Sequence, residues 1–487
     1  MRLHSDHAGI RKDIPLTATN GETLPALEVF SHALKFLSDH LRNAVKISTG
    51  ANIREDNIRW VITVPAIWND AAKQFMREAA YKAGIASRYH RNRLLIALEP
   101  EAASLFCRQL PVSHFRGETA NPKSLQMDPQ ERYMVVDCGG GTVDVTVYEI
   151  RDDDSVRELH RPTGGPWGGT NVDSNFRTLL DKIFGKDFMN DYRHNFPQEN
   201  VQLMADFEMR KRSAADASVH LNYNFVSFLK RTSSQNITDI VSNSNVEGVR
   251  FSNGLLRMSK EVMHSLFQPV LDQITIHIQS LLANPKLNIK TIFLVGGFAD
   301  SPLLKTAVVD RVSNSEVRVL VPEEASLAVI KGAVLFGRNP DSIKERLSAR
   351  TYGVRSTTEF KEGVHPSQHR VVTEGLTLCT DIFNKLVEVD DVVVLQESKS
   401  MTFKAIRDDQ QGATVYLYCT GEKNPEFTTD PGMTICGRVH VDMPDTRGGK
   451  ERTIEVKFTF GRTEIDVQAE DLTSHTRAFT TIDFLQS

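Results

Sequence analysis

The chain has 487 residues, so two or three domains with proper hydrophobic cores are expected rather than one. Its 58 Lys and Arg residues face 62 Asp and Glu residues, and the net charge of −4 excludes a broad basic field for nucleic acid. No apolar run approaches the roughly 20 residues that span a bilayer, which argues against membrane insertion. The five cysteines are widely spaced without a CxxC pair, so they indicate reduced thiols and a cytoplasmic location.

The first hundred residues alternate helical and strand patterns. Apolar residues at steps of three and four predict a helix over 25–41, and the β-branched run at 59–65 predicts a buried central strand. Asn69 is expected to cap a second helix that Gly84 ends. A further strand at 94–97 precedes a predicted helix over 99–110.

The same pattern continues through the middle of the chain. A strand hairpin is predicted over 133–150, helix-rich spans over 171–215 and 260–282, and a strand and helix at 292–295 and 301–312. The polar segments 120–130 and 231–245 are predicted to be surface loops. This alternation indicates layered α/β architecture up to about residue 340.

Beyond Tyr352 the pattern changes to short alternating strands split by Gly, Asp and Pro turns. We therefore expect a boundary near 341–352 and a small β-rich sandwich over 353–487. The predicted domains are 1–340, whose second lobe covers roughly 133–340, and 353–487.

The sharpest chemical signal runs from Asp137 to Asp144, where three consecutive glycines stand between two β-branched strands. Without side chains in the way, the backbone N–H groups of such a hairpin can close around phosphate oxygens, while the two carboxylates can hold hydrated Mg²⁺. An ordinary glycine-rich hairpin is the alternative. We favour a phosphate loop unrelated to the Walker type.

Two further glycine pairs are weaker signals. Gly296 and Gly297 end a buried strand, the place where ligands bind in open α/β sheets. Gly168 and Gly169 precede a helix N-terminus whose free N–H groups can meet a phosphate, although a plain loop is about as probable.

Two charged segments have both a functional and a purely structural interpretation. Glu208, Lys211 and Arg212 share neighbouring turns of one predicted helix, suited to ribose and base contacts or equally to a solvated charged face. Glu99 follows a buried strand, from which it can order a metal-bound water or simply serve as a helix N-terminal acid.

Together these segments resemble the heat-shock-70 family in order and spacing. The resemblance rests on VITVPAIWND at 61–70, LEPEAA at 98–103, DCGGGTVD at 137–144, GGT at 168–170 and LVGG at 294–297, with Glu208 and Lys211 between. It covers about 1–340, and its variants look like the divergent 12-type subfamily. It implies an α/β, actin-like and ribonuclease-H-like ATPase domain, followed by a β-sandwich similar to the family's peptide-binding domain.

The resemblance also implies roles for individual residues, with ATP or ADP and Mg²⁺ as cofactors and client polypeptides or other proteins as partners. The implied catalytic residues are Glu99, Thr142 and Asp144, and the implied metal residues, acting through water, are Asp137 and Asp144. The implied nucleotide-binding residues are Asp137, Gly139, Gly140, Gly141, Thr142, Gly168, Gly169, Glu208, Lys211, Arg212, Gly296, Gly297, Phe298 and Glu323.

The sequence departs from the family pattern in two places. The family opens with Asp-Xaa-Gly-Thr-Thr, and nothing like it precedes Pro15, so we expect an N-terminally incomplete first lobe that lacks one phosphate loop. Such a lobe should leave apolar surface uncovered. Phe298 and Asp300 stand where commoner members have a serine and an adenine-stacking arginine, which weakens adenine specificity.

These features predict an ATP/ADP-binding, chaperone-like or regulatory protein in which hydrolysis is weak or absent, because phosphoryl transfer depends on a complete phosphate clamp. A non-catalytic protein-interaction adaptor is the alternative from a different class. A sugar or acetate kinase of the same superfamily is a third reading, which the β domain disfavours.

Overall fold

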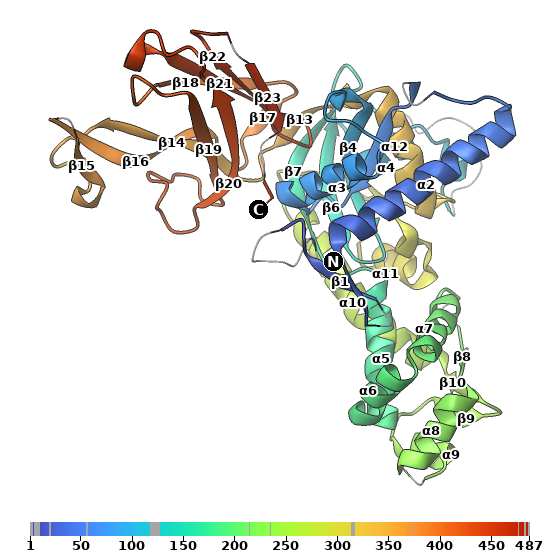
Figure 1. Ribbon diagram of the computed structural model, residues 1–487. Coiled ribbons are helices and arrows are strands. Elements are labelled where there is room, and N and C mark those ends of the chain that lie inside the picture. Colours follow the sequence, from blue (N-terminus) through green and yellow to red (C-terminus); the bar gives the residue numbers. More distant parts are fainter. Residues whose placement is uncertain are drawn as a thin grey trace.

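The computed structural model of the chain describes residues 3, 10–18, 21–54, 57–116, 127–213, 215–233, 235–312, 317–373, 375–475, 477–481 and 484–485. Figure 1 shows an α/β body in the middle, a mainly helical lobe that projects from it, and an all-β part on the other side. The α/β fold expected from the sequence is confirmed.

A seven-stranded sheet in the order β12-β11-β5-β6-β7-β13-β17 forms the centre of the body. The strands are β5 (Arg132–Cys138), β6 (Val143–Ile150), β7 (Val156–Gly165), β11 (Thr291–Val295), β12 (Arg318–Leu320), β13 (Ile343–Leu347) and β17 (Val392–Val394). Strands β5, β6 and β7 are antiparallel neighbours, whereas β11 runs parallel to β5 and to β12. All eight residues of β6 are buried, including the polar residues Asp144, Thr146 and Glu149.

Helices cover both faces of this sheet, so alternate residues of one strand enter different cores. Met134 and Val136 of β5 pack in the core shared with α5 (Thr170–Phe184) and α10 (Lys260–Leu282). Tyr133 and Val135 pack in the core on the other face, beside α4 and α12. The helices that complete the two layers are α4 (Glu99–Cys107), α11 (Pro302–Val312) and α12 (Ala328–Arg338).

The first lobe contains the parallel pair β3 (Trp60–Val64) and β4 (Leu94–Leu98), with α2 (Ala26–Thr49) and α3 (Asp70–Lys82). The capping prediction is confirmed, because the Asn69 side chain accepts from the Ala72 N–H at 2.9 Å. A short hairpin, β1 (Pro15–Thr17) with β2 (Thr23–Pro25), precedes α2.

The outer face of α2 carries large apolar side chains in solvent. Their exposed fractions lie between 50 % and 85 % for Phe36, Leu37, Leu41 and Ile47. Within the described part of the chain, β3 has a strand neighbour only on its β4 side. The first lobe therefore exposes a row of apolar side chains on α2.

The projecting lobe combines helices with a small antiparallel sheet in the order β8-β10-β9 (Figure 1). Its elements are α6 (Lys186–Asn195), α7 (Pro197–Lys211), β8 (Ala217–His220), α8 (Tyr223–Ser233), α9 (Ile237–Asn243), β9 (Val249–Ser252) and β10 (Leu255–Met258). The loop predicted over 231–245 is wrong: Asn236 caps α9 by accepting from the Thr238 N–H at 3.2 Å, and Ile237 is buried. Most of the other predicted loop, 120–130, lies outside the described residues.

The all-β part consists of two facing sheets. The first has the order β15-β16-β14-β19-β20 and the second β18-β21-β22-β23. The strands are β14 (Thr351–Glu359), β15 (Arg370–Thr373), β16 (Leu376–Val387), β18 (Ser398–Lys404), β19 (Gly412–Thr420), β20 (Thr434–Asp442), β21 (Thr453–Thr459), β22 (Asp466–Asp471) and β23 (Arg477–Thr481). Val354 and Leu417 of one sheet share a core with Val456 and Phe458 of the other, which makes this part a β-sandwich.

The sandwich and the body contact each other at several places. Strand β17, from within 353–487, pairs with β13 in the large sheet. The turn between β21 and β22 lies against the first lobe, where the Thr463 hydroxyl donates to the Ile96 carbonyl at 2.6 Å. The Arg77 Nε on α3 donates to Glu464 at 2.7 Å. The division into independent domains at 341–352 stays a prediction.

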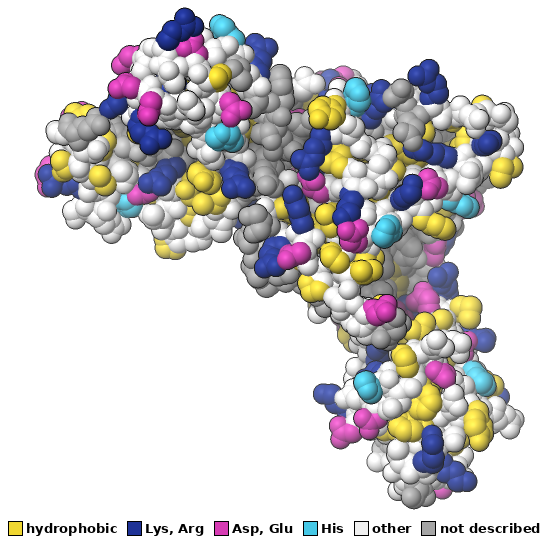
Figure 2. Space-filling model, in the orientation of Figure 1, with side chains coloured by type: hydrophobic (Ala, Val, Ile, Leu, Met, Phe, Trp, Pro, Cys, Tyr) yellow, Lys and Arg dark blue, Asp and Glu magenta, His cyan; other side chains and the backbone are white. Residues whose placement is uncertain are grey.

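The distribution of charged side chains over the surface agrees with the small net charge of −4. On the face drawn in Figure 2, Lys and Arg side chains are interspersed with Asp and Glu side chains over all three parts. None of the helices in the described part of the chain is long and apolar enough to cross a membrane.

Candidate nucleotide-binding site

The glycine turn between β5 and β6 is held by its own backbone. The Gly139 N–H donates to the Thr142 carbonyl at 2.9 Å. Asp137 and Asp144 are direct partners across the two strands, one on each side of the turn. Both carboxylates and Thr142 are buried, with exposed fractions of 4 %, 1 % and 7 %. The sequence motif therefore forms a compact hairpin with two opposed acids at its base.

A third acid joins this pair from the first lobe. Glu99 is the first residue of α4, at the end of β4. Burial, together with the charges of Asp137 and Asp144, raises the pKa of Glu99 to about 9. Burial and the charge of Asp144 raise the pKa of Asp137 to about 7. The three carboxylates therefore lie close enough to influence one another's ionisation.

This acid cluster suits a divalent cation held through water. The Ile67 N–H, in the segment after β3, donates to Asp144 Oδ1 at 2.8 Å, so the first lobe reaches the second across the cluster. Among the described residues, no group of three His, Cys, Asp or Glu side chains is arranged to bind a metal ion directly. Carboxylates at longer range fit a hydrated Mg²⁺, which usually keeps several of its waters.

Gly140 and Gly297 face open space, whereas Gly168 and Gly296 lie where two loops approach each other closely. A Cβ at Gly140 or at Gly297 would meet no atom within 4 Å. A Cβ at Gly168 would instead collide with the Gly140 carbonyl, and one at Gly296, whose φ is +91°, would collide with Asp137. The backbone at Gly140 and Gly297 is thus bare toward solvent, whereas Gly168 and Gly296 allow the loops to approach each other.

The interpretation of Gly168 and Gly169 as donors of free N–H groups to a phosphate is wrong. The Gly168 and Gly169 N–H groups donate to the carbonyls of Gly141 and Gly139 at 3.3 and 3.1 Å. The Thr170 N–H donates in the same way to Gly140 at 2.8 Å. This loop therefore braces the back of the glycine hairpin, and its donors are already used.

The charged helix of the sequence analysis lies beside this bracing loop. Lys211 on α7 is buried, and its Nζ donates to the Gly169 carbonyl at 3.1 Å and to Asp173 at 2.8 Å. It also pairs with Glu208, which in turn pairs with Arg212 at 3.3 Å. Lys211 thus ties α7 to the hairpin support, while most of the Arg212 side chain is exposed.

The segment after β11 has mixed roles. The Phe298 ring is buried and packs against Phe267 with ring centroids 6.1 Å apart, so it supports the site from the core. Glu323 is exposed, and its N–H donates to the His114 carbonyl at 2.9 Å.

Arg116 is a residue of this region that sequence reasoning missed. Its guanidinium pairs with Asp300 and donates to the Glu323 carbonyl at 2.8 Å. The sequence had suggested that Asp300 removes a guanidinium from the base pocket. In the structure a guanidinium does lie beside Asp300, and Arg116 supplies it from a distant segment. No sequence pattern marks this pair, so only the contact in the structure reveals it.

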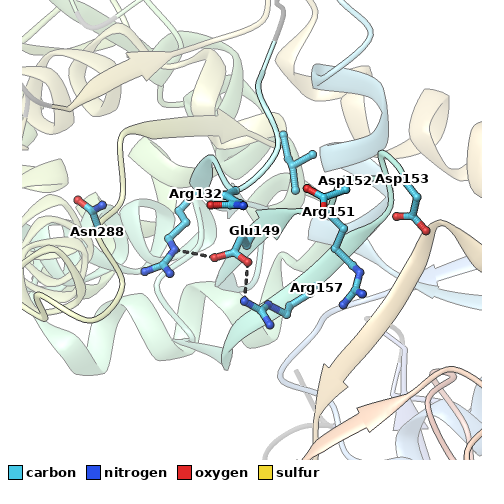
Figure 3. A pocket seen from close by; sticks show the side chains of 9 residues that line it. Arg132, Glu149, Arg151, Asp152, Asp153, Arg157 and Asn288 are labelled. Carbon is cyan, nitrogen blue, oxygen red and sulfur yellow. Dashed lines mark hydrogen bonds and ion pairs between the residues drawn. The ribbon is translucent and has the colours of Figure 1, made fainter.

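A cavity of about 690 Å³ lies at the other end of the same hairpin (Figure 3). Arg132 Nε donates to Glu149 at 2.8 Å, and Arg157 pairs with the same carboxylate. Because Glu149 is six residues along β6 from the glycine turn, the cavity is about 20 Å away from it. Its arginines are engaged with a carboxylate, and we assign it no part in the nucleotide site.

Comparison with known proteins identifies the relatives of this fold. The family model described as Hsp70 protein matches residues 12–483. Heat shock 70 kDa protein 12A of Mus musculus is 36 % identical over 535 residues, covering 100 % of this chain and 79 % of the relative. Heat shock 70 kDa protein 12B of Homo sapiens is 36 % identical over 543 residues with the same coverage.

A more distant relative shares part of the chain. Chaperone protein dnaK of Cyanidium caldarium is 28 % identical over 355 residues, covering 70 % of this chain and 49 % of the relative. The family match extends through the β-sandwich as well as the α/β body. The chain therefore belongs to the Hsp70 family, with the 12A and 12B proteins among its relatives.

Proposed function

We propose that this chain binds ATP or ADP with Mg²⁺ at the β5–β6 hairpin and acts as a chaperone-like or regulatory protein. The observation that carries the proposal is the meeting of three acids, Glu99, Asp137 and Asp144, with the bare backbone at Gly140 and Gly297. The acids suit a hydrated cation, and the bare backbone suits phosphate oxygens.

Each residue has a role that follows from its place. Gly140, Gly141 and Thr142 would hold phosphate oxygens with their backbone N–H groups, while the Gly139 N–H closes the turn on the Thr142 carbonyl. Asp137 and Asp144 would hold the water shell of Mg²⁺. The cation supplies positive charge against the phosphates. Glu99, at the edge of the acid cluster, would order a water beside the cation. Lys211 and Glu208 would border the ribose, and Gly297, Arg116 and Glu323 the base.

We infer slow hydrolysis for the chain assayed by itself. Among the described residues before 117, the glycines are Gly21, Gly50 and Gly84, each at positive φ and each with open space around it. Gly50 caps α2 and Gly84 follows α3, so they serve helix ends. The phosphates would therefore be clamped chiefly from the second lobe, which lowers transition-state stabilisation.

The proposal extends to the partner and the compartment. The two sheets of the sandwich share one core, and the family match covers this part of the chain. We propose that the sandwich binds polypeptide clients or other proteins. A cytoplasmic location fits the five free cysteines.

Titration with a fluorescent ATP analogue, with and without Mg²⁺, tests nucleotide binding, and single-turnover hydrolysis then tests catalysis. We expect Mg²⁺-dependent binding with slow turnover. Binding that is absent under both conditions would overturn the proposal and leave the non-catalytic adaptor, which the exposed apolar face of α2 also suits.

Replacing Glu99 with Gln is expected to raise thermal stability without ligand and to remove most of the stabilisation that Mg²⁺ and nucleotide give. Burial and the charges of Asp137 and Asp144 raise the pKa of Glu99 to about 9, so folding at neutral pH has to protonate this carboxyl group, whereas Gln needs no proton. Each pH unit between the unfolded pKa and the working pH corresponds to about 1.4 kcal/mol of that cost. Thermal denaturation with and without Mg²⁺-ATP measures both effects. Glu131→Gln, at an acid outside the cluster, is the matched control; equal ligand stabilisation in Glu99→Gln would count against the role of Glu99.

A further inference from the structure

Two cysteines of the sandwich stand side by side on neighbouring strands. Cys419 is on β19 and Cys436 on β20, which pair antiparallel. The register shifts where Leu417 faces Gly437 and Tyr418 faces Ile435, so Cys436 is the extra residue of a bulge. Both side chains pack against the core of the sandwich, and they therefore lie on the same side of the sheet.

The sulfur of Cys419 lies among donors. Arg350 Nη1 donates to it at 3.6 Å, and the Thr434 hydroxyl lies 3.5 Å away. The Cys436 thiol lies 3.5 Å from the Leu417 carbonyl. A guanidinium and a hydroxyl around one sulfur favour its thiolate form over the thiol.

The two sulfurs differ in acidity because of these contacts. A hydrogen bond from Cys436, helped by Thr434 and Arg350, holds the pKa of Cys419 below its usual range. Burial and the neighbouring Cys419 sulfur raise the pKa of Cys436. One member of the pair is thus a nucleophile and the other a protonated thiol, the division of roles found in reactive dithiols.

We propose that Cys419 and Cys436 are a redox modification site, at which hydrogen peroxide converts the two thiols into a disulfide between β19 and β20. The Cys419 thiolate attacks one peroxide oxygen, the O–O bond breaks, and hydroxide leaves, giving a sulfenic acid. The Cys436 sulfur then attacks the Cys419 sulfur and releases the sulfenic oxygen as water. In total, two thiols and one peroxide give one disulfide and two waters.

The site also lies at the junction of sandwich and body. Arg350 lines a cavity of about 410 Å³ that both parts enclose, together with Asp70 and Tyr352. The Tyr352 hydroxyl donates to Asp70 at 2.6 Å across this junction. The cavity gives a small oxidant a route to Arg350, and disulfide formation would take from Arg350 its sulfur partner.

The remaining cysteines have no comparable surroundings. Burial raises the pKa of Cys379, of Cys138 and of Cys107. Cys379 lies on β16 in the same sandwich, and its sulfur contacts the Thr380 carbonyl at 3.8 Å. It provides a matched control for any general loosening of the sandwich.

The test exposes the full chain to hydrogen peroxide and maps its peptides without reduction. We expect a linked pair of peptides that contain Cys419 and Cys436, reversed by dithiothreitol. In Cys436→Ser, the sulfenic acid on Cys419 should persist and be captured by dimedone. Cys379→Ser should leave both results unchanged.

Arg350→Gln tests the cause of the reactivity. At pH 5, below the Cys419 pKa of about 6, its oxidation rate should fall roughly tenfold, the effect of about one pKa unit on the thiolate fraction. Arg355→Gln, on the same sheet and away from the two sulfurs, should keep the original rate. The proposal is overturned if the folded chain gives no Cys419–Cys436 linkage, if peroxide links other cysteines first, or if Arg350→Gln reacts at the original rate.

Discussion

Gly140→Val is expected to lower the affinity for Mg²⁺-ATP at least about a hundredfold, equivalent to about 2.7 kcal/mol, with little change in stability. A Cβ at Gly140 meets no atom within 4 Å, so the added isopropyl group fills space that the fold leaves open. In the proposed function this space belongs to the phosphates. Fluorescence titration measures the affinity, and thermal denaturation without ligand measures the stability.

Two other glycines are the controls for this substitution. Gly363→Ala lies in a sandwich turn with open space around it and should leave affinity unchanged, at a small cost in stability because its φ is +75°. Gly168→Ala should reduce stability and affinity together, since its Cβ would push the bracing loop off the hairpin. Undiminished affinity in Gly140→Val would show that phosphate does not bind there.

Local patterns predicted the individual elements well. Helix α10 spans Lys260–Leu282 as the apolar periodicity indicated, and it begins there because the Ser259 side chain accepts from the Val262 N–H. Strands β3 and β4 lie where the β-branched run at 59–65 and the apolar run at 94–97 predicted them. These signals are carried by neighbouring residues, so a single sequence is enough to detect them.

Long-range pairings were not predictable in this way. The three-residue strand β17 joins β13 because the register of Val393 against Arg346 is set by packing between distant segments. Helix α9 was mistaken for a loop because it is only seven residues long and rich in polar side chains. Neither feature produces a periodic pattern that is long enough to identify.

The site shows the same limit. Glu99, Asp137 and Asp144 each stand at the end of a strand, and the structure brings them together as the motifs suggested. The function of the Gly168 and Gly169 backbone was misjudged because donors that look free in a sequence can be used by another loop. Arg116 was missed because its segment, between α4 and β5, has no motif of its own.

Arg346→Ala is expected to lower the free energy of unfolding by about 3–5 kcal/mol, the largest stability effect among these substitutions. Arg346 donates to both carboxylate oxygens of Glu101, at 2.7 and 2.9 Å. Glu101 has no exposed surface, so without Arg346 its charge would stay buried with no cation beside it. Urea denaturation of the full chain measures the loss.

The same guanidinium joins three parts of the fold, which makes the loss cooperative. Arg346 belongs to β13, Glu101 to α4, and Arg346 also donates to the Gly461 carbonyl in the turn between β21 and β22. Burial and the charge of Glu101 raise the pKa of Glu158 to about 8, while Arg346 opposes this shift. Removing Arg346 therefore leaves a second carboxylate under greater repulsion.

Acidic pH and a paired substitution distinguish this account from a simple loss of packing. A carboxyl group whose pKa is higher in the folded than in the unfolded state lowers the stability of the fold as pH rises between these two pKa values. The loss of unfolding free energy in Arg346→Ala should therefore be smaller at pH 5 than at pH 8. The double variant Arg346→Met with Glu101→Leu removes both charges and should recover most of the lost stability. Arg338→Ala, an arginine at the end of α12, should cost less than about 1 kcal/mol. If the double variant is as unstable as Arg346→Ala at both pH values, the buried charge of Glu101 is not the cause, and the contact with the Gly461 carbonyl holds the sandwich turn to the body.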